Sequence, residues 1–147
     1  MGKMLSRTIA IAADHGGYDL KRSLKEALEG MGYDVLYLGT DGSEPVDYPD
    51  FANAMAAALG GGRAERGVLI CGSGIGISIA ANRHRHIRAA LCHSVEAAQL
   101  ARRHNDANVM AVGARLTNAE MARGMLLVFL ETDFEGGRHL QRVTKLG

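Results

Sequence analysis

The 147-residue sequence has no tryptophan and only two cysteines and two prolines. Two cysteines cannot build the disulfide framework of a small secreted protein, and no Cys-x-x-Cys pair is present, so a reducing, cytoplasmic setting is expected. No apolar run is as long as a membrane span, and the N-terminus lacks the apolar stretch of a signal peptide. We therefore expect no membrane partner. Residues 1–6 match a loose N-myristoylation pattern, and we interpret them as an unstructured start.

The chain also has little charge of either sign in excess, with 17 basic and 16 acidic residues. It has no basic tail interleaved with aromatic side chains, so no nucleic-acid partner is expected. A hydrophobic content of 47% is typical of a globular domain. We predict one domain over residues 1–147, with a polar C-terminal tail at 131–147 that ends in a basic segment.

Short apolar segments alternate with longer segments of helical periodicity. The predicted strands are 8–13, 34–38, 67–71, 87–92 and 108–112. Helical patterns follow each of them, and Ser94 and the capping box that starts at Thr117 mark the beginning of two helices. This alternation predicts an α/β fold, a single doubly wound (Rossmann-like) five-stranded parallel sheet of order 2-1-3-4-5 with helices on both faces.

In such sheets, ligands bind beyond the carboxyl ends of the strands, at the switch point between strands 1 and 3. Asp14-His15-Gly16-Gly17 follows the first strand, and Cys71-Gly72-Ser73-Gly74-Ile75-Gly76 follows the third. Both loops should therefore meet at one edge of the sheet. The sequence predicts a ligand site there.

Cys71 ends an apolar strand directly before a glycine-rich turn into a helix. Backbone amides in such a turn favour a negative charge, which would make a thiolate or a proton acceptor available. A buried structural cysteine is an equally good interpretation from position alone, since free cysteines are often small core residues. Cys92 has no comparable loop after it and is expected to lie in the core.

The loop after the third strand has glycines at 72, 74 and 76. Such spacing lets backbone amides face an oxyanion or a phosphate, and Ser73 adds a hydroxyl group. A dinucleotide-binding loop would need glycine where Ile77 stands, and a P-loop would need Gly-Lys-Ser or Gly-Lys-Thr. A dehydrogenase is therefore disfavoured.

Several polar groups could assist at this edge. Asp14 and His15 could bind an anion or move a proton, or could simply cap the turn. Arg138 and Arg142 are four residues apart, so on a helix they would share one face and could hold a phosphate. Arg115 follows the fifth strand and could join them.

His104 and Asn105 form a further polar cluster, which without other information is a helix end with a histidine placed favourably on the helix dipole. His84 and His86 lie in a basic stretch that we interpret as surface. Because no acidic or cysteine partner is near this pair, we expect no metal site.

Taken together, these residues resemble the ribose-5-phosphate isomerase B family, which includes the galactose-6-phosphate isomerase subunits. The resemblance extends over nearly the whole chain and depends on five motifs in order. They are Ala13-Asp14-His15-Gly16-Gly17, Asp47-Tyr48-Pro49, Ile70-Cys71-Gly72-Ser73-Gly74-Ile75-Gly76, Arg103-His104-Asn105-Asp106 and Gly136-Gly137-Arg138-His139.

The resemblance implies a role for each matching position. Cys71 would be the base that moves a proton between C1 and C2 of the open-chain sugar, and Ser73 would assist at the oxygens. His104 would open the sugar ring. Another branch of the family uses a Glu base where this chain has Ile77, so Cys71 is the candidate base on this loop.

The same resemblance implies binding residues. The phosphate would be held by His15, Arg115, Arg138 and Arg142. Contacts to the sugar hydroxyls would come from Asp14, Tyr48 and Asn105, and the enediolate would be stabilised by the amides of Gly72 to Gly76, which include Gly74 and Ile75.

The implied activity is interconversion of ribose 5-phosphate and ribulose 5-phosphate through a cis-enediolate, without metal or cofactor, in the pentose phosphate pathway of carbohydrate metabolism. A six-carbon substrate, allose 6-phosphate or galactose 6-phosphate, is the alternative within this class. A non-catalytic nucleotide-binding α/β module is the alternative outside it.

The predicted topology adds one expectation about His104. It ends the helix after the fourth strand, which places it at the amino edge of the sheet, whereas Cys71 lies at the carboxyl edge. A strand of five or six residues separates these edges by roughly 17–20 Å. We therefore expect His104 to reach Cys71 of a neighbouring subunit, in a homodimer or a dimer of dimers with shared active sites.

Overall fold

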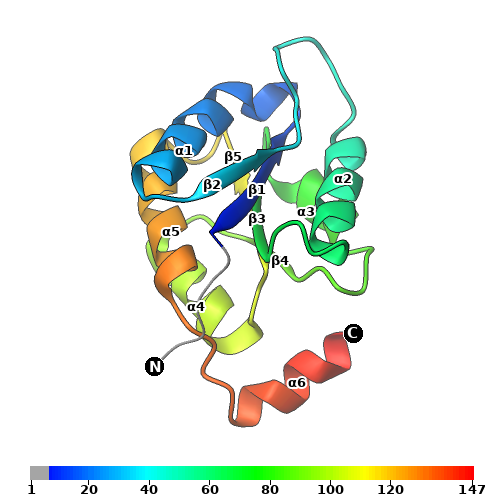
Figure 1. Cartoon of the computed structure of the whole chain (residues 1–147), viewed down its shortest axis with the longest axis vertical. Helices are drawn as coiled ribbons and strands as arrows, with labels where there is room; N and C mark the ends of the chain where they lie inside the picture. Colours follow the sequence, from blue (N-terminus) through cyan, green and yellow to red (C-terminus); the bar gives the residue numbers. More distant parts are fainter. Residues whose placement is uncertain (1–6) are drawn as a thin grey trace.

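The computed structural model of this protein describes residues 7–147, and the interpretation of residues 1–6 lies outside that part. Five strands form one parallel sheet (Figure 1). The strands are β1 (Thr8–Ala13), β2 (Asp34–Tyr37), β3 (Arg66–Cys71), β4 (Ala89–Leu91) and β5 (Val109–Gly113). The helices are the short 3-10 helix η1 (His15–Gly17), α1 (Tyr18–Gly30), α2 (Tyr48–Gly60), α3 (Ile75–Ala81), α4 (Val95–Asn105), α5 (Ala119–Glu131) and α6 (Arg138–Leu146).

The three central strands are apolar on both faces because helices cover the sheet on both sides. Successive side chains of a strand point to opposite faces, so they enter two separate cores. Ile70 of β3 lies in the core beneath α1, α4 and α5, together with Phe129. Cys71, the next residue, lies in the core beneath α2 and α3, together with Met55 and Ile77. This alternation directs the Cys71 side chain to the α2–α3 side.

The predicted fold class is confirmed: the sheet is parallel, five-stranded and covered on both faces. Its order is β2-β1-β3-β5-β4, which differs from the predicted 2-1-3-4-5 because β5, not β4, lies beside β3. All five residues of β5 are buried, whereas β4 has three residues that are only partly buried. Placing β5 inside the sheet and β4 at the edge removes more apolar surface from water.

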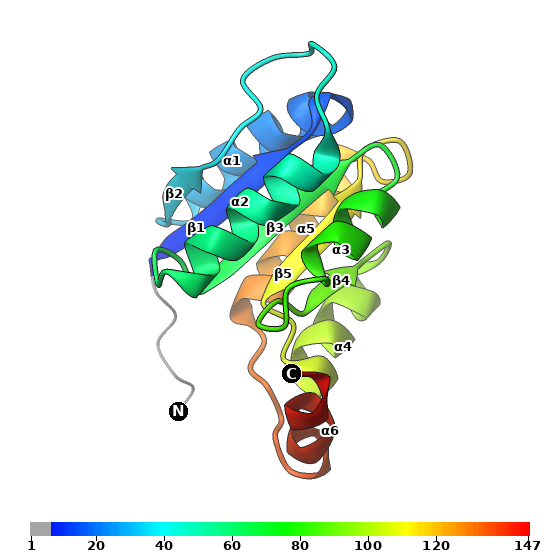
Figure 2. The same ribbon diagram turned by 90° about the vertical axis from the view of Figure 1, so that its right-hand side faces the viewer.

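This order also decides which face each helix covers. Parallel crossover connections are right-handed, so connections that move in opposite directions along the sheet place their helices on opposite faces. The β3-to-β4 connection moves outward and puts α3 beside α2, while the β4-to-β5 connection returns and puts α4 beside α5. Figure 2 shows α2 and α3 in front of the sheet and α1, α4 and α5 behind it.

The sequence signals for helix ends are largely confirmed. The Ser94 side chain accepts a hydrogen bond from the Ala97 amide and caps α4. The capping box predicted at Thr117 is shifted by one residue, because Asn118 is the N-cap of α5 and accepts from the Met121 amide. The Thr117 hydroxyl is buried and has no hydrogen-bond partner among the described residues.

Helix α6 lies apart from the layered body, beyond the amino edge of the sheet and next to the end of α4 (Figure 2). It is amphipathic but leaves Leu140 and Leu146 more than half exposed. A sequence predicted only as a polar tail therefore forms a helix that carries apolar side chains into solvent. Within residues 7–147, no helix is both long enough and apolar enough to span a membrane.

Candidate active site

A cavity of about 300 Å³ opens at the carboxyl edge of the sheet, at the predicted switch point between β1 and β3. Three loops and the start of α2 enclose it. The residues that line it are Asp14, His15, Gly16, Tyr48, Cys71, Gly72, Ser73, Gly76, Arg115 and Leu116. The structure thus brings together eight of the residues singled out in the sequence, which come from four separate segments of the chain.

The Cys71 side chain forms part of the cavity floor and is almost completely buried, with 4% of its surface exposed. Its Sγ atom accepts a hydrogen bond from the backbone amide of Gly74 over 3.1 Å. Gly74 has φ = +78°, which strains any other residue type, and a Cβ atom there would lie 2.5 Å from Leu91 Cδ1. Glycine at position 74 therefore allows the tight turn that aims an amide at the sulfur.

Ser73 faces the same cavity. Its Oγ atom accepts a hydrogen bond from the Ile75 amide over 3.1 Å, at the start of α3. Because the hydroxyl accepts in this bond, its own proton can be donated to another group. The amides of Gly74 and Ile75 thus support the side chains of Cys71 and Ser73, so they are already engaged within the loop.

The turn after β1 lies against this loop. Asp14 is buried, with only 7% of its surface exposed. Its Oδ1 atom accepts a hydrogen bond from the Gly16 amide over 2.9 Å. A Cβ atom at Gly16 would lie 3.2 Å from the Gly72 amide nitrogen, so the two backbones approach closely. The carboxylate is held by its own turn and is presented to the cavity.

The imidazole of His15 is fixed by a backbone group. Its Nδ1 atom accepts a hydrogen bond from the Val46 amide over 3.1 Å. A ring nitrogen that accepts carries no proton, so the neutral ring has its proton on Nε2. His15 can therefore present an N–H donor to an anion in the cavity without itself being charged.

Arg115 and Tyr48 complete the rim. The Arg115 amide donates to the Gly72 carbonyl over 2.9 Å, which places its guanidinium beside the loop. Tyr48 begins α2 and is 40% exposed. A Cβ atom at Gly76 would lie 2.6 Å from Tyr48 Cζ, so the phenol ring rests directly on the helix that follows the glycine loop.

Six predicted site residues do not line this cavity. Gly74 and Ile75 belong to the glycine loop, where their amides bond to Cys71 and Ser73, and the other four lie far from it. His104 and Asn105 end α4, and Arg138 and Arg142 belong to α6. Helix α4 runs antiparallel to the strands, so its end lies at the amino edge of the sheet, at the opposite end from Cys71 (Figure 2). The predicted placement of His104 and Cys71 at opposite edges is confirmed.

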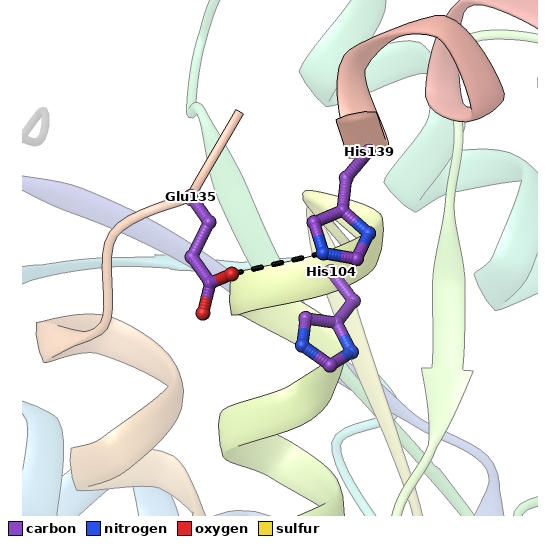
Figure 3. Close-up of side chains that lie close together, drawn as sticks. All are labelled: His104, Glu135 and His139. Atoms are coloured by element: carbon purple, nitrogen blue, oxygen red, sulfur yellow. Dashed lines mark ion pairs between the residues drawn. The ribbon is translucent and has the colours of Figure 1, made fainter. Parts of the chain in front are cut away.

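Figure 3 shows how His104 is held at that edge. Its ring stacks on the ring of His139, with centroids 4.3 Å apart and planes 13° from parallel. Glu135 Oε1 lies 3.6 Å from His139 Nε2, and Glu135 also accepts from Arg103 Nε over 2.6 Å. This contact fastens the beginning of α6 to the end of α4.

The neighbouring groups in this cluster lower the pKa values of both Glu135 and His139. The hydrogen bond from Arg103 is the main factor that lowers the pKa of Glu135. Burial, followed by the neighbouring His104, lowers the pKa of His139. Although the two imidazoles and the Glu135 carboxylate offer ligand atoms within 4.8 Å of one another, the in-plane lone pairs of parallel rings do not converge on one ion. The geometry favours a stacked pair over a metal centre.

Cys92, His84 and His86 lie outside the cavity and have structural contacts. Cys92 is 1% exposed, and burial raises its pKa to about 11, so it is a core residue as predicted. His84 Nε2 lies 2.8 Å from Asn53 Oδ1, and His86 Nε2 lies 2.7 Å from the Ala56 carbonyl oxygen. These two histidines tie their loop to α2.

Sequence reasoning missed three contributors to the cavity. Gly16 and Leu116 line it, and Val46 supplies the amide that fixes His15. Gly16 is part of a quoted motif, and its position next to His15 could have identified it. The contribution of Val46 is a backbone group on an irregular loop, which has no side-chain signature in the sequence.

Comparison with known proteins agrees with this geometry. The ribose/galactose isomerase family matches residues 9–146. The chain is 45% identical over 137 residues to ribose-5-phosphate isomerase B of Escherichia coli. This alignment covers 93% of this chain and 92% of that protein. It is 42% identical over 142 residues to D-erythrulose-4-phosphate isomerase of Pectobacterium atrosepticum, in an alignment that covers 95% of this chain and 93% of that protein. The structure of Clostridium thermocellum ribose-5-phosphate isomerase B superposes with a TM-score of 0.94 and 47% identity, covering 95% of both chains. The chain therefore belongs to the ribose/galactose isomerase family of enzymes.

Proposed function

We propose that this enzyme interconverts ribose 5-phosphate and ribulose 5-phosphate through a cis-enediolate, with Cys71 as the base and without a metal ion. The observation that carries the proposal is the position of the Cys71 sulfur. It lies in the floor of a cavity of about 300 Å³, hydrogen-bonded to the Gly74 amide and adjacent in the chain to the Gly72–Ser73 turn. A cavity of this size is at the lower end of the range typical of small-molecule sites.

The reaction needs a base at carbon and a proton donor at oxygen. Cys71, as a thiolate, removes the proton from C2 of the open-chain aldose, and the electron pair moves to form the enediolate. The thiol then returns the proton to C1, which produces the ketose. The Ser73 hydroxyl, whose oxygen is already held by the Ile75 amide, passes a proton between O1 and O2. The Gly74 amide holds the sulfur in place for this step through its hydrogen bond of 3.1 Å.

The amides of Gly72 and Gly76 are proposed to face the enediolate oxygens. Asp14 and Tyr48 are proposed to contact the sugar hydroxyls. At the other end of the cavity, His15 and Arg115 are proposed to hold the phosphate. Arg115 supplies a positive charge, and His15 supplies the Nε2–H donor that its bond to Val46 leaves free to donate.

His104 and Asn105, together with Arg138 and Arg142, are proposed to act in the cavity of a second subunit. In one chain they lie at the amino edge, on α4 and on the outlying α6. The exposed Leu140 and Leu146 of α6 support such an assembly, because the apolar face of an amphipathic helix is normally packed against another surface. The proposed unit is a homodimer, or a dimer of dimers, in which residues 131–147 form part of the one domain of residues 1–147.

The proposal is tested with ribose 5-phosphate and EDTA, using the wild type, Cys71→Ala and the matched control Cys92→Ala. We expect turnover by the wild type, a loss of at least about a thousandfold in kcat for Cys71→Ala, and near-normal kcat for Cys92→Ala, because only the first removes the base. Wild-type activity that survives in Cys71→Ala would show that another group is the base.

A panel of substrates separates the alternatives. Allose 6-phosphate and galactose 6-phosphate test the six-carbon reaction. D-Erythrulose 4-phosphate tests the four-carbon reaction for which the Pectobacterium relative is named. If none of these sugars is turned over and a nucleotide raises the melting temperature, the nucleotide-binding module is supported instead. The cytoplasmic location and the pentose phosphate pathway stay predictions.

A further inference from the structure

Lys21 is a buried charged group that no step of the proposed reaction uses. It lies on α1 and its side chain is completely buried. The ammonium group donates to the Tyr37 hydroxyl and to the Thr40 carbonyl oxygen, and it lies 5.2 Å from the centre of the Tyr18 ring. Burial lowers the pKa of Lys21 to about 8, and the nearby Asp41 opposes that shift. Burying an ammonium group costs free energy unless hydrogen bonds compensate for the lost water. The groups to which Lys21 donates therefore indicate its role.

The bond to Tyr37 reaches the last residue of β2, and the bond to Thr40 holds the segment between β2 and α2. Residues 38–47 form no regular secondary structure, and half of them are exposed. Thr40 is the anchored point, because its carbonyl oxygen also accepts from the Tyr37 hydroxyl over 3.1 Å. Its amide donates to the Ala13 carbonyl over 2.8 Å, and the Ala13 amide donates to the Gly39 carbonyl over 2.8 Å. The loop therefore starts fastened to the last residue of β1, directly before Asp14 and His15.

The far end of the same loop returns to the active-site cavity. The Val46 amide donates to His15 Nδ1 over 3.1 Å, and Tyr48 begins α2 at the cavity rim two residues later. The position of the Val46 amide decides which nitrogen of His15 carries the proton and where the ring points. A surface loop of ten residues without regular secondary structure would otherwise hold that amide loosely.

We propose that Lys21 is a positioning residue of the substrate site: it fixes Thr40 and thereby the 38–47 loop, whose Val46 amide aligns the His15 imidazole toward the phosphate. This inference rests on the proposed function for the identity of the phosphate. Lys21 itself touches no substrate, since it is buried between α1 and β2.

The experiment compares the wild type with Lys21→Met, which keeps the length of the side chain and removes the ammonium. Lys25→Met is the control, because Lys25 lies one turn further along α1, is 39% exposed and pairs with Glu29 instead of the loop. Three quantities are measured in each: KM and kcat for ribose 5-phosphate, the Kd for inorganic phosphate, and the His15 tautomer from the ¹⁵N shifts of its ring.

For Lys21→Met we expect KM and the phosphate Kd each to rise about tenfold or more, since each 1.4 kcal/mol corresponds to a factor of ten, with kcat changed by less than about threefold. The His15 spectrum should change from a single Nε2–H form to a mixture of both tautomers. Lys25→Met should match the wild type in all three. A Lys21→Met protein that is folded, with an unchanged phosphate Kd and an unchanged His15 tautomer, would overturn the proposal.

Tyr37→Phe is the second variant if Lys21→Met does not fold. It keeps the ammonium but removes the hydroxyl that bonds to both Lys21 and Thr40. A smaller change in the same direction supports the proposal, and wild-type values for the phosphate Kd and the His15 tautomer contradict it. If the wild type does not turn over ribose 5-phosphate, the proposed function fails, while the tautomer and the phosphate Kd still decide the role of Lys21.

Discussion

The Gly74 amide and the Cys71 sulfur lie 3.1 Å apart, as hydrogen-bond donor and acceptor. The two residues are three positions apart in the chain, so the contact is made entirely within one loop. The contact therefore holds the Cys71 sulfur at the cavity, whereas the Cys92 sulfur donates to the Ala90 carbonyl within the core.

This difference predicts selective alkylation. At pH 8, iodoacetamide should attach one carboxamidomethyl group to Cys71, and activity should be lost in step. Cys92 should stay unmodified, because burial raises its pKa to about 11 and leaves only about one thiol in a thousand ionised at that pH. Peptide mass spectrometry gives the site of modification, and ribose 5-phosphate should slow the reaction. Equal labelling of the two cysteines would contradict this.

The separation of His104 from Cys71 predicts complementation between two inactive variants. If each cavity combines Cys71 of one chain with His104 of another, a heterodimer of Cys71→Ala and His104→Ala has one intact site and one doubly defective site. Random co-refolding of equal amounts should therefore restore roughly a quarter of wild-type activity. The control is each variant refolded alone, and a mixture no more active than these would show that the two residues do not meet across subunits.

Lys21 predicts how stability depends on pH. The lysine has a pKa of about 8 in the folded chain against its usual 10.5, so between these values the unfolded chain binds more protons. The free energy of unfolding of the wild type should therefore rise with pH across this interval, relative to Lys21→Met. Urea unfolding from pH 7 to 10.5 measures it. The difference is taken between the two proteins because Cys92, whose pKa is raised, opposes the trend equally in both.

A constant difference in the free energy of unfolding over that pH range would show that Lys21 titrates at its usual value. In Lys25→Met the rise should persist but begin at a higher pH, because the Lys25 charge, after burial, also lowers the pKa of Lys21.

Substitution of Gly76 should lower kcat/KM without lowering the melting temperature. In Gly76→Ala, the new Cβ atom would lie 2.6 Å from Tyr48 Cζ, so the exposed phenol ring must move away from the cavity. Alanine favours a helix over glycine by about 1 kcal/mol, so the melting temperature should not fall. We expect kcat/KM to fall about tenfold or more. Gly30→Ala is the control, because a Cβ atom there meets nothing within 4 Å. Unchanged kcat/KM in Gly76→Ala would show that the position of Tyr48 is unimportant.

The local features of this protein are those that its sequence determines. Buried parallel strands consist of unbroken apolar runs, so the strand Thr8–Ala13 could be located from the order of its residues alone. The observed strand has the same bounds. The meeting of Asp14 with Cys71 was also predictable, because neighbouring parallel strands end at the same edge of a sheet. Each of these inferences needs only residues close in the sequence, together with one general rule of topology.

Tertiary structure decided the rest, through competition between distant segments. The choice of β5 over β4 for the inner position depended on the total surface that each strand buries, which no local pattern records. The stacking of His139 on His104 required a tail helix that the sequence showed only as polar. The contact of Lys21 with Thr40 and the contact of Val46 with His15 join residues 19 and 31 positions apart, through a backbone oxygen and a backbone amide. Backbone groups are the same in every residue, so only the folded chain shows which of them reach the active site.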